Sequence, residues 1–203
     1  MNSRLLLVTI GVVIAAAAVI PTRPEPPILD KFSRGVVDST DVKYYDVRGR
    51  TPGEVAESME RLGPQGNGDP AHTRTSYRPA WHTIKDGEGR CDLTAVRVTT
   101  LSRGVAPRWT PPADTVPGLY AEWQRFASAL EQHEAGHKEI SDRGAREILD
   151  GMLAMKTFCS QVSRDVNRLA DSVAAQTDSR QDAYDRLTRH GGSQGAAFLG
   201  RLP

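Results

Sequence analysis

Residues 119 to 155 carry the feature that most restricts the fold, an apolar stripe with the period of an α-helix. The side chains that define it recur at intervals of 4, 3 and 4 residues: Leu119, Trp123, Phe126 and Leu130. Side chains at these intervals lie on one face of a helix. The stripe therefore predicts one long helix from about Leu119 to Met155, with Gly144 or Gly151 as the places where it can bend.

Two histidines continue this stripe. Further intervals of 3 and 4 residues reach His133 and His137, so both imidazoles lie on the buried face. They belong to His133-Glu134-Ala135-Gly136-His137, an H-E-x-x-H motif. Imidazoles one turn apart can bind a single metal ion, and Glu134 beside them can accept a proton from metal-bound water. The motif predicts a Zn²⁺ site with Glu134 as catalytic base; the alternative is an ordinary amphipathic helix with two histidines.

A catalytic zinc ion usually has three protein ligands and a water molecule, so one ligand must come from outside the motif. The acidic residues that follow on the same helix are excluded. Glu147 shares the stripe, but the rise of the helix places it about 15 Å away. Glu139 and Asp142 face away from the histidines. The third ligand is therefore expected from another segment.

The chain offers several candidates for this ligand. His190 is the best of them, because it lies directly before a double glycine that allows a tight turn. Asp185 is an alternative, either as the ligand itself or as the hydrogen-bond acceptor that orients an imidazole. His72 and His82 remain possible, although no pattern of residues supports them.

The N-terminal segment has the pattern of an export signal. An apolar run from Leu5 to Ile20 follows one basic residue, and a proline-rich spacer comes after it. We expect residues 1–20 to be a secretory signal peptide or, if uncleaved, a membrane anchor. A flexible linker at 21–39 and a zinc-metalloprotease-like domain at 40–203 should follow. The protein is then periplasmic or secreted, with membrane contact only through the N-terminal segment.

The cysteines and the charge agree with export. An even number of cysteines in an oxidising compartment predicts a disulfide bond between Cys91 and Cys159. Two buried free thiols are the alternative. The net charge is +1, which gives no basic surface for nucleic acid, so no nucleic-acid partner is expected. The oligomeric state is left open.

The remaining segments predict an α+β fold. Before the long helix we expect a strand at Val42–Val47, a helix from the Thr51–Glu54 capping box to Leu62, a hairpin of Ser76–Lys85 and Cys91–Ser102, and irregular structure at Pro107–Pro117. After it we expect a helix at about 158–175 and a shorter helical piece from Asp178. The fold class is thus a small antiparallel sheet with an N-terminal short helix, followed by a helical half that carries the H-E-x-x-H helix, as in zincin-like proteins.

Several short motifs follow one another over roughly residues 40 to 195. They are Tyr44-Tyr45-Asp46-Val47 with Gly49 and Thr51-Pro52, Cys91, Pro107-Arg108-Trp109, Trp123, Leu130, the H-E-x-x-H, Cys159, and Tyr184-Asp185 with Thr188, His190 and Gly191. In this order they resemble a bacterial family of predicted secreted zinc-dependent proteases, catalogued as domain of unknown function 922. The resemblance implies that His190 is the third metal ligand, beside His133 and His137.

The function expected from these residues is zinc-dependent hydrolysis of a peptide or protein. Zinc would activate its bound water, and Glu134 would transfer the proton to the leaving nitrogen. Tyr184 is a candidate oxyanion stabiliser, with core packing as its alternative role. Two other functions stay open: a non-catalytic envelope protein with a structural zinc or a helix-packing role, and a zinc amidohydrolase that acts on cell-wall peptide.

Overall fold

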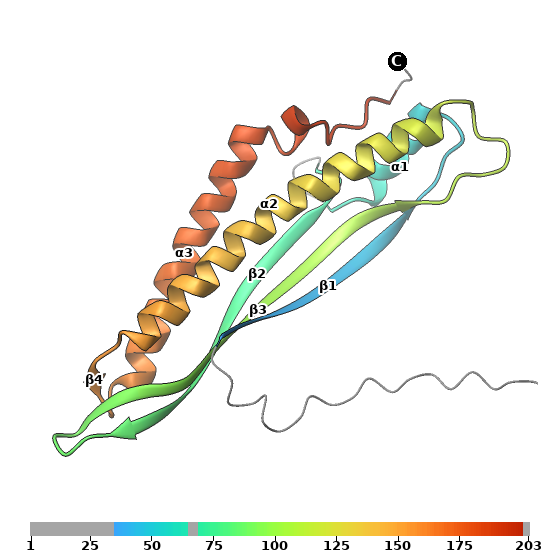
Figure 1. Cartoon of the computed structure of the whole chain (residues 1–203). Coiled ribbons are helices and arrows are strands. Elements are labelled where there is room, and N and C mark those ends of the chain that lie inside the picture. Colours follow the sequence, from blue (N-terminus) through green and yellow to red (C-terminus); the bar gives the residue numbers. More distant parts are fainter. Residues whose placement is uncertain (1–34, 65–68, 201–203) are drawn as a thin grey trace, which may run out of the picture. The chain divides into compact units, whose positions relative to one another are not determined.

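The computed structural model describes residues 35–64 and 69–200 (Figure 1). Its elements in chain order are β1 (Gly35–Val47), α1 (Pro52–Leu62), β2 (His72–Lys85), β3 (Arg90–Trp109), α2 (Leu119–Leu153), β4 (Thr157–Phe158), α3 (Val162–Thr188) and the 3₁₀ turn η2 (Gly192–Gln194). The predicted leader at 1–20 and most of the predicted linker lie outside the described residues. The predicted α+β class is confirmed. Within the described ranges, no helix is both long enough and apolar enough to cross a membrane.

β3 is the central strand of the sheet, with β1 on one side and β2 on the other. β2 and β3 form the predicted antiparallel hairpin. β1 instead pairs with β3 in parallel, from Gly35 opposite Arg97 to Val47 opposite Trp109. The sheet is therefore mixed, and the prediction of an antiparallel sheet is wrong in this respect. α1 and β2 lie between β1 and β3 in the chain, and a connection of this length allows two strands to pair in parallel.

Three strands are longer than predicted, and the first difference is that β2 begins at His72 rather than Ser76. β1 begins at Gly35 rather than Val42, so residues 35–39 form strand and not linker. β3 continues through Pro107 to its end, a stretch predicted to be irregular. Proline is tolerated there because β2 pairs with β3 only as far as Val105, which leaves one side of β3 without a ladder partner.

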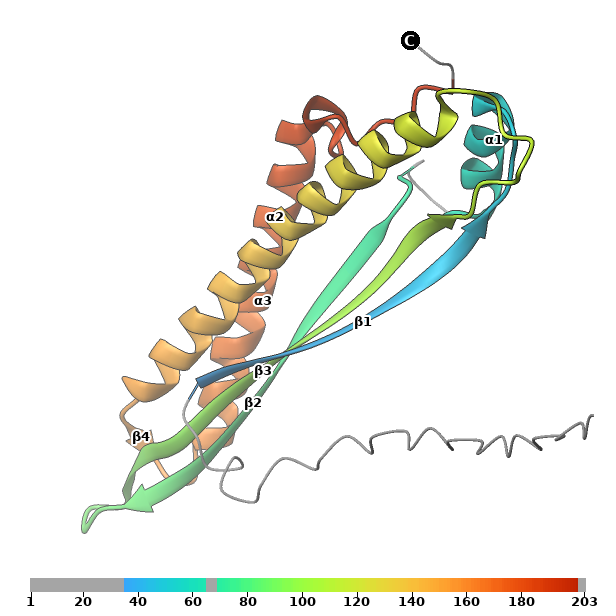
Figure 2. The ribbon, with the colours of Figure 1, turned by 45° about the vertical axis from the view of Figure 1, so that its right-hand side comes forward.

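α2 and α3 lie side by side over one face of the sheet (Figures 1 and 2). α2 is unbroken and passes through both Gly144 and Gly151, as its apolar stripe predicts. α3 is also continuous, whereas the sequence predicted a helix that ends near Ala175 and a separate piece from Asp178. The last turns of α3 carry no apolar stripe of their own. Their contacts with α2 keep them helical, because packing contributes more to helix stability than propensity does.

Buried side chains hold the helices to the sheet in two clusters. At the N-terminal end of α2, the rings of Trp109, Trp123 and Phe126 pack in sequence, with neighbouring centroids 5.5 and 5.4 Å apart. Toward the C-terminal end of α2, Ile148 and Met152 are fully buried against β3 and α3. α2 is therefore fixed at both ends, and the H-E-x-x-H motif lies between them.

Two local predictions are confirmed. α1 begins at the capping box, in which Thr51 Oγ1 accepts from the Glu54 backbone at 3.3 Å and Glu54 Oε2 accepts from the Thr51 backbone at 3.4 Å. Cys91 on β3 and Cys159 after β4 form the disulfide bond. Their separation of 68 residues makes the bond worth about 4 kcal/mol in the chain-entropy description. A disulfide bond fits an extracytoplasmic location.

Candidate metal centre

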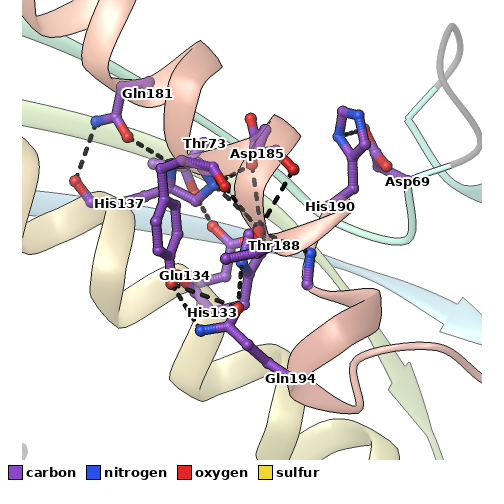
Figure 3. A network of polar contacts seen from close by, with 12 residues as sticks. Asp69, Thr73, His133, Glu134, His137, Gln181, Asp185, Thr188, His190 and Gln194 are labelled. Atoms are coloured by element: carbon purple, nitrogen blue, oxygen red, sulfur yellow. Dashed lines mark hydrogen bonds and ion pairs between the residues drawn. The ribbon is translucent and has the colours of Figure 1, made fainter.

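α2 and α3 together bring three possible metal-binding atoms to one point (Figure 3). His133 and His137 lie one turn apart on α2, and their Nε2 atoms are 3.1 Å from each other. Asp185 lies near the end of α3, and its Oδ1 is 3.3 Å from His133 Nε2 and 2.9 Å from His137 Nε2. Among the described residues, this is the one group of three His, Cys, Asp or Glu side chains whose ligand atoms converge.

The spacing of these atoms fits a zinc ion. Two ligand atoms at the usual zinc distances and a tetrahedral angle lie about 3.3 Å apart. The three observed separations are 2.9, 3.1 and 3.3 Å. His133 is only 6% exposed and His137 13%, so water screens the charges here weakly. Two imidazole nitrogens and a carboxylate oxygen are also a donor set that catalytic zinc uses.

Two glutamines determine which ring nitrogen of each histidine carries the hydrogen. Gln194 Oε1 lies 2.9 Å from His133 Nδ1, and Gln181 Oε1 contacts His137 Nδ1. Gln181 Nε2 donates to the His137 carbonyl at 3.0 Å, which fixes the orientation of that amide, and Gln194 Nε2 donates to the Tyr184 hydroxyl at 3.0 Å. Because an amide oxygen can only accept, each Nδ1 donates and each Nε2 directs its lone pair toward the shared point.

Glu134 lines the same cavity as the two histidines and is held there by a hydrogen bond. Its Oε2 accepts a hydrogen bond from Thr73 Oγ1 on β2, at 2.9 Å. This bond ties the carboxylate of α2 to the neighbouring strand, on the wall of the cavity that also contains His133 and His137. The carboxylate thus shares a cavity with the three converging residues and is not one of them.

Tyr184 packs directly on the two histidines. Its ring is stacked on His133 with centroids 5.1 Å apart, and it lies edge-on to His137 at 5.0 Å. The contact requires glycine at position 136, because a Cβ there would be 2.2 Å from the Tyr184 hydroxyl oxygen. Tyr184 is not among the residues that line the cavity. This placement favours the packing role over an oxyanion role.

His190, the predicted third ligand, lies outside the group of converging atoms. Its Nδ1 is 3.2 Å from Asp69 Oδ2, and Figure 3 shows this pair to one side of the group. α3 ends at Thr188, and the next two residues have left-handed backbones with φ of 53° and 52°, which turns the chain away from the donors. Asp185, the alternative in the sequence, thus lies with the two histidines, and His190 does not.

The turn after α3 brings Gln194 back to His133. Gly191 continues the left-handed run with φ of 78°, and its backbone N donates to Thr188 Oγ1 at 3.2 Å. A Cβ on Gly191 would be 3.0 Å from His133 Cγ, so only glycine allows this approach to the ring. The double glycine that favoured His190 in the sequence serves to place Gln194 instead.

The other two histidine candidates have different surroundings. His72 Nε2 accepts a hydrogen bond from Arg74 Nε at 3.0 Å. His82 lies farther along β2, opposite Thr94 of β3. Neither belongs to the converging group.

An open cavity of about 370 Å³ faces the three donors. β2 and the residue before it contribute five consecutive residues, 71–75, to its wall. Successive side chains of a strand point to opposite faces, so a run of this kind lines a cavity along the edge of the strand. β2 is an edge strand of the sheet. Its backbone edge therefore faces the cavity, opposite α3.

The cavity is acidic. The carboxylates on its walls outnumber the single arginine, Arg74; they are Asp69, Glu134, Asp178, Asp182 and Asp185. Such an excess of negative charge raises the local concentration of cations. Farther along β2, Tyr77 donates to the Ser141 carbonyl at 2.9 Å, and burial raises the pKa of its phenol.

Sequence reasoning missed Thr73, Gln181 and Gln194. Gln181 lies one turn before Asp185, so a continuous α3 would have placed it on the same face. Thr73 and Gln194 carry no local pattern, because each acts on a residue 61 positions away.

The fold and the site together define an α+β protein with a candidate zinc centre on an H-E-x-x-H helix. Residues 42–191 match the family described as bacterial protein of unknown function (DUF922), and the chain belongs to this family. Comparisons with curated proteins and with solved structures gave no match. The membership expected from the order of the motifs is confirmed, whereas the family description assigns no activity.

Proposed function

We propose that this protein is a zinc-dependent peptidase. The observation that carries the proposal is the convergence of His133, His137 and Asp185 beside Glu134, in a cavity that is open to substrate. A structural zinc site has four protein ligands and no open position. Three donors that face a cavity favour a catalytic site over a structural one.

Zinc is favoured over iron, although non-haem iron enzymes also use two histidines and one carboxylate. The distinguishing residue is Glu134, which follows His133 directly and is held in place by Thr73. A fixed carboxylate beside the metal ligands serves proton transfer in hydrolysis. Oxygen activation by iron has no comparable need for it.

In the proposed reaction, each of these residues has a separate role. Bound zinc would supply Lewis-acid chemistry, which polarises the scissile carbonyl and makes a water molecule more acidic. Glu134 accepts a proton from the attacking water and then gives it to the leaving nitrogen. Thr73 keeps the carboxylate oriented, and Gln181 and Gln194 keep the Nε2 lone pairs of the histidines directed at the metal.

A peptide is favoured as the substrate because a strand edge lines the cavity. Residues 71–75 present backbone N–H and C=O groups along the edge of β2. An extended peptide can add to such an edge through main-chain hydrogen bonds. It would then lie between β2 and α3, with its backbone crossing over Glu134.

Two substitutions test the proposal. Glu134→Gln keeps the metal ligands, so we expect one zinc per chain by mass spectrometry of the metals and a loss of casein and peptide hydrolysis of at least about 100-fold. Asp185→Asn removes the third donor, so zinc affinity should fall at least about tenfold. Glu131→Gln on the exposed side of α2 and Asp171→Asn on α3 are matched controls.

Two results would contradict the proposal. If Glu134→Gln cleaves peptides at the wild-type rate, Glu134 is not the base. If the purified protein contains iron and no zinc after equal exposure to both, the assignment of the metal is wrong.

A further inference from the structure

A second cavity opens beside the metal centre, between α1, α2 and the C-terminal segment. Its volume is about 910 Å³, compared with about 370 Å³ for the first cavity. The metal centre does not use it, since none of the three donors lines it. Its size lies within the range of small-molecule and side-chain binding sites.

The wall of this second cavity has an apolar part and a charged part. Phe126 is fully buried, Met59 and Ala196 are 8% and 3% exposed, and the ring of Phe198 is 5.5 Å from that of Phe126. The charged side chains at the cavity balance one another, with Arg61 and Arg189 against Glu60 and Asp69. The apolar part of the wall can therefore contact an uncharged, apolar group, and the charged part adds no net charge.

The two cavities are neighbours and share part of their walls. Asp69, Pro70 and His190 line both of them. The pair formed by His190 Nδ1 and Asp69 Oδ2 thus lies at the boundary, and Figure 3 shows it next to the converging donors. Pro70 also accepts a hydrogen bond from the Tyr45 hydroxyl through its carbonyl, at 2.8 Å, which fixes the boundary to β1.

The path of a bound peptide leads toward this boundary. Residues 71–75 form the strand edge of the first cavity, and Asp69 and Pro70 continue the same chain into the second. A peptide that follows the edge of β2 past Glu134 therefore places its next side chain beside His190. The apolar wall of the second cavity lies directly beyond.

We propose that the second cavity is a specificity site, which takes a large apolar side chain, such as leucine, methionine or phenylalanine, from the substrate residue next to the cleaved bond. This inference rests on the proposed peptidase function and adds a substrate class to it. Met59, Phe126 and Phe198 form the apolar surface, and His190 separates it from the metal centre.

The first experiment measures binding without catalysis. The ε-methyl groups of methionine are labelled with ¹³C in the metal-free protein, which is then titrated with N-acetyl-leucinamide. The Met59 methyl resonance should shift, whereas Met152 and Met155, in the other buried cluster, should not. N-acetyl-glycinamide is the control ligand. If leucinamide moves Met59 no more than glycinamide does, the cavity is not an apolar site.

The second experiment uses the zinc-loaded protein and a synthetic library of peptides of known sequence. We expect cleavage next to leucine, methionine or phenylalanine, at one fixed position. Ala197→Phe fills the cavity from its exposed rim, so kcat/KM for leucine peptides should fall about tenfold or more relative to alanine peptides. Met59→Ala should widen the preference. Ala175→Phe, on the exposed side of α3, is the matched control.

The outcomes separate the two proposals. Cleavage without a preference, or a preference that Ala197→Phe leaves unchanged, overturns the specificity site and leaves the peptidase. A Met59 shift with leucinamide in a protein that cleaves no peptide overturns the peptidase, and the apolar site stands as a binding site alone.

Discussion

The replacement Gly136→Ala tests how closely α2 and α3 approach at the metal centre. A Cβ at this position would lie 2.2, 2.5 and 2.9 Å from three atoms of the Tyr184 phenol. Ordinary contact begins near 3.4 Å, so the tyrosine must retreat by about 1 Å, and overpacking of this kind costs about 1–3 kcal/mol. Alanine also stabilises a helix by up to about 1 kcal/mol relative to glycine, which offsets part of this cost.

Gly53→Ala is the control that separates these two terms. Gly53 lies in α1, and nothing lies within 4 Å of a Cβ placed there. It should therefore show only the gain from helix propensity. We expect Gly136→Ala to be less stable than Gly53→Ala by about 1–3 kcal/mol, as measured by urea unfolding with unchanged m-values.

The same replacement should also weaken zinc binding. Tyr184 is stacked on His133 and accepts a hydrogen bond from Gln194, so its retreat disturbs the orientation of that ring. We expect a loss of zinc affinity of about tenfold by competition with a chelator. Adding Tyr184→Ala should remove the steric term, so the two changes should couple by about 1 kcal/mol or more. Equal stability of the two alanine variants, without coupling, would refute the proposed contact.

Three further predictions follow from other contacts. Gln194→Ala removes the acceptor of His133 Nδ1 and should lower zinc affinity about 10- to 100-fold, measured by chelator competition, with little change in the unfolding midpoint. Joint replacement of Cys91 and Cys159 by alanine should lower the free energy of unfolding by about 4 kcal/mol in urea, and a loss below about 1 kcal/mol would contradict the loop-closure estimate. Burial raises the pKa of Tyr45 from 10.0 to about 12, so the unfolded chain loses the phenol proton at a lower pH than the folded protein does. The free energy of unfolding should therefore fall as pH rises from 10 to 12. Tyr45→Phe should remove the contribution of this phenol to the fall, as measured by urea unfolding at several pH values.

The elements with strong local patterns could be predicted from the sequence. The apolar stripe of α2 determined both its length and the buried position of His133. The capping box at Thr51 marked the start of α1 in the same way. In each case the interactions that form the element involve residues within one or two turns, which a local pattern can record.

The parallel pairing of β1 and the third metal donor could not be predicted in this way. Gly35 pairs with Arg97, and nothing in either segment specifies the partner or the direction. The last turns of α3 are polar, so their helicity depends on α2, and the position of Asp185 depends on that helicity. The glycines beside His190 and the family resemblance both favour it in the sequence, but in the structure Gly191 allows the chain to approach His133.

The metal centre draws its parts from positions far apart in the sequence. Thr73 and Glu134 are 61 residues apart, as are His133 and Gln194. A chain made from its N-terminus thus presents the H-E-x-x-H helix well before the third donor and the second glutamine exist. Until α3 and its closing turn have folded, the two imidazoles lack both Asp185 and Gln194. If the site binds zinc as proposed, a growing or shortened chain would therefore bind it more weakly than the folded protein.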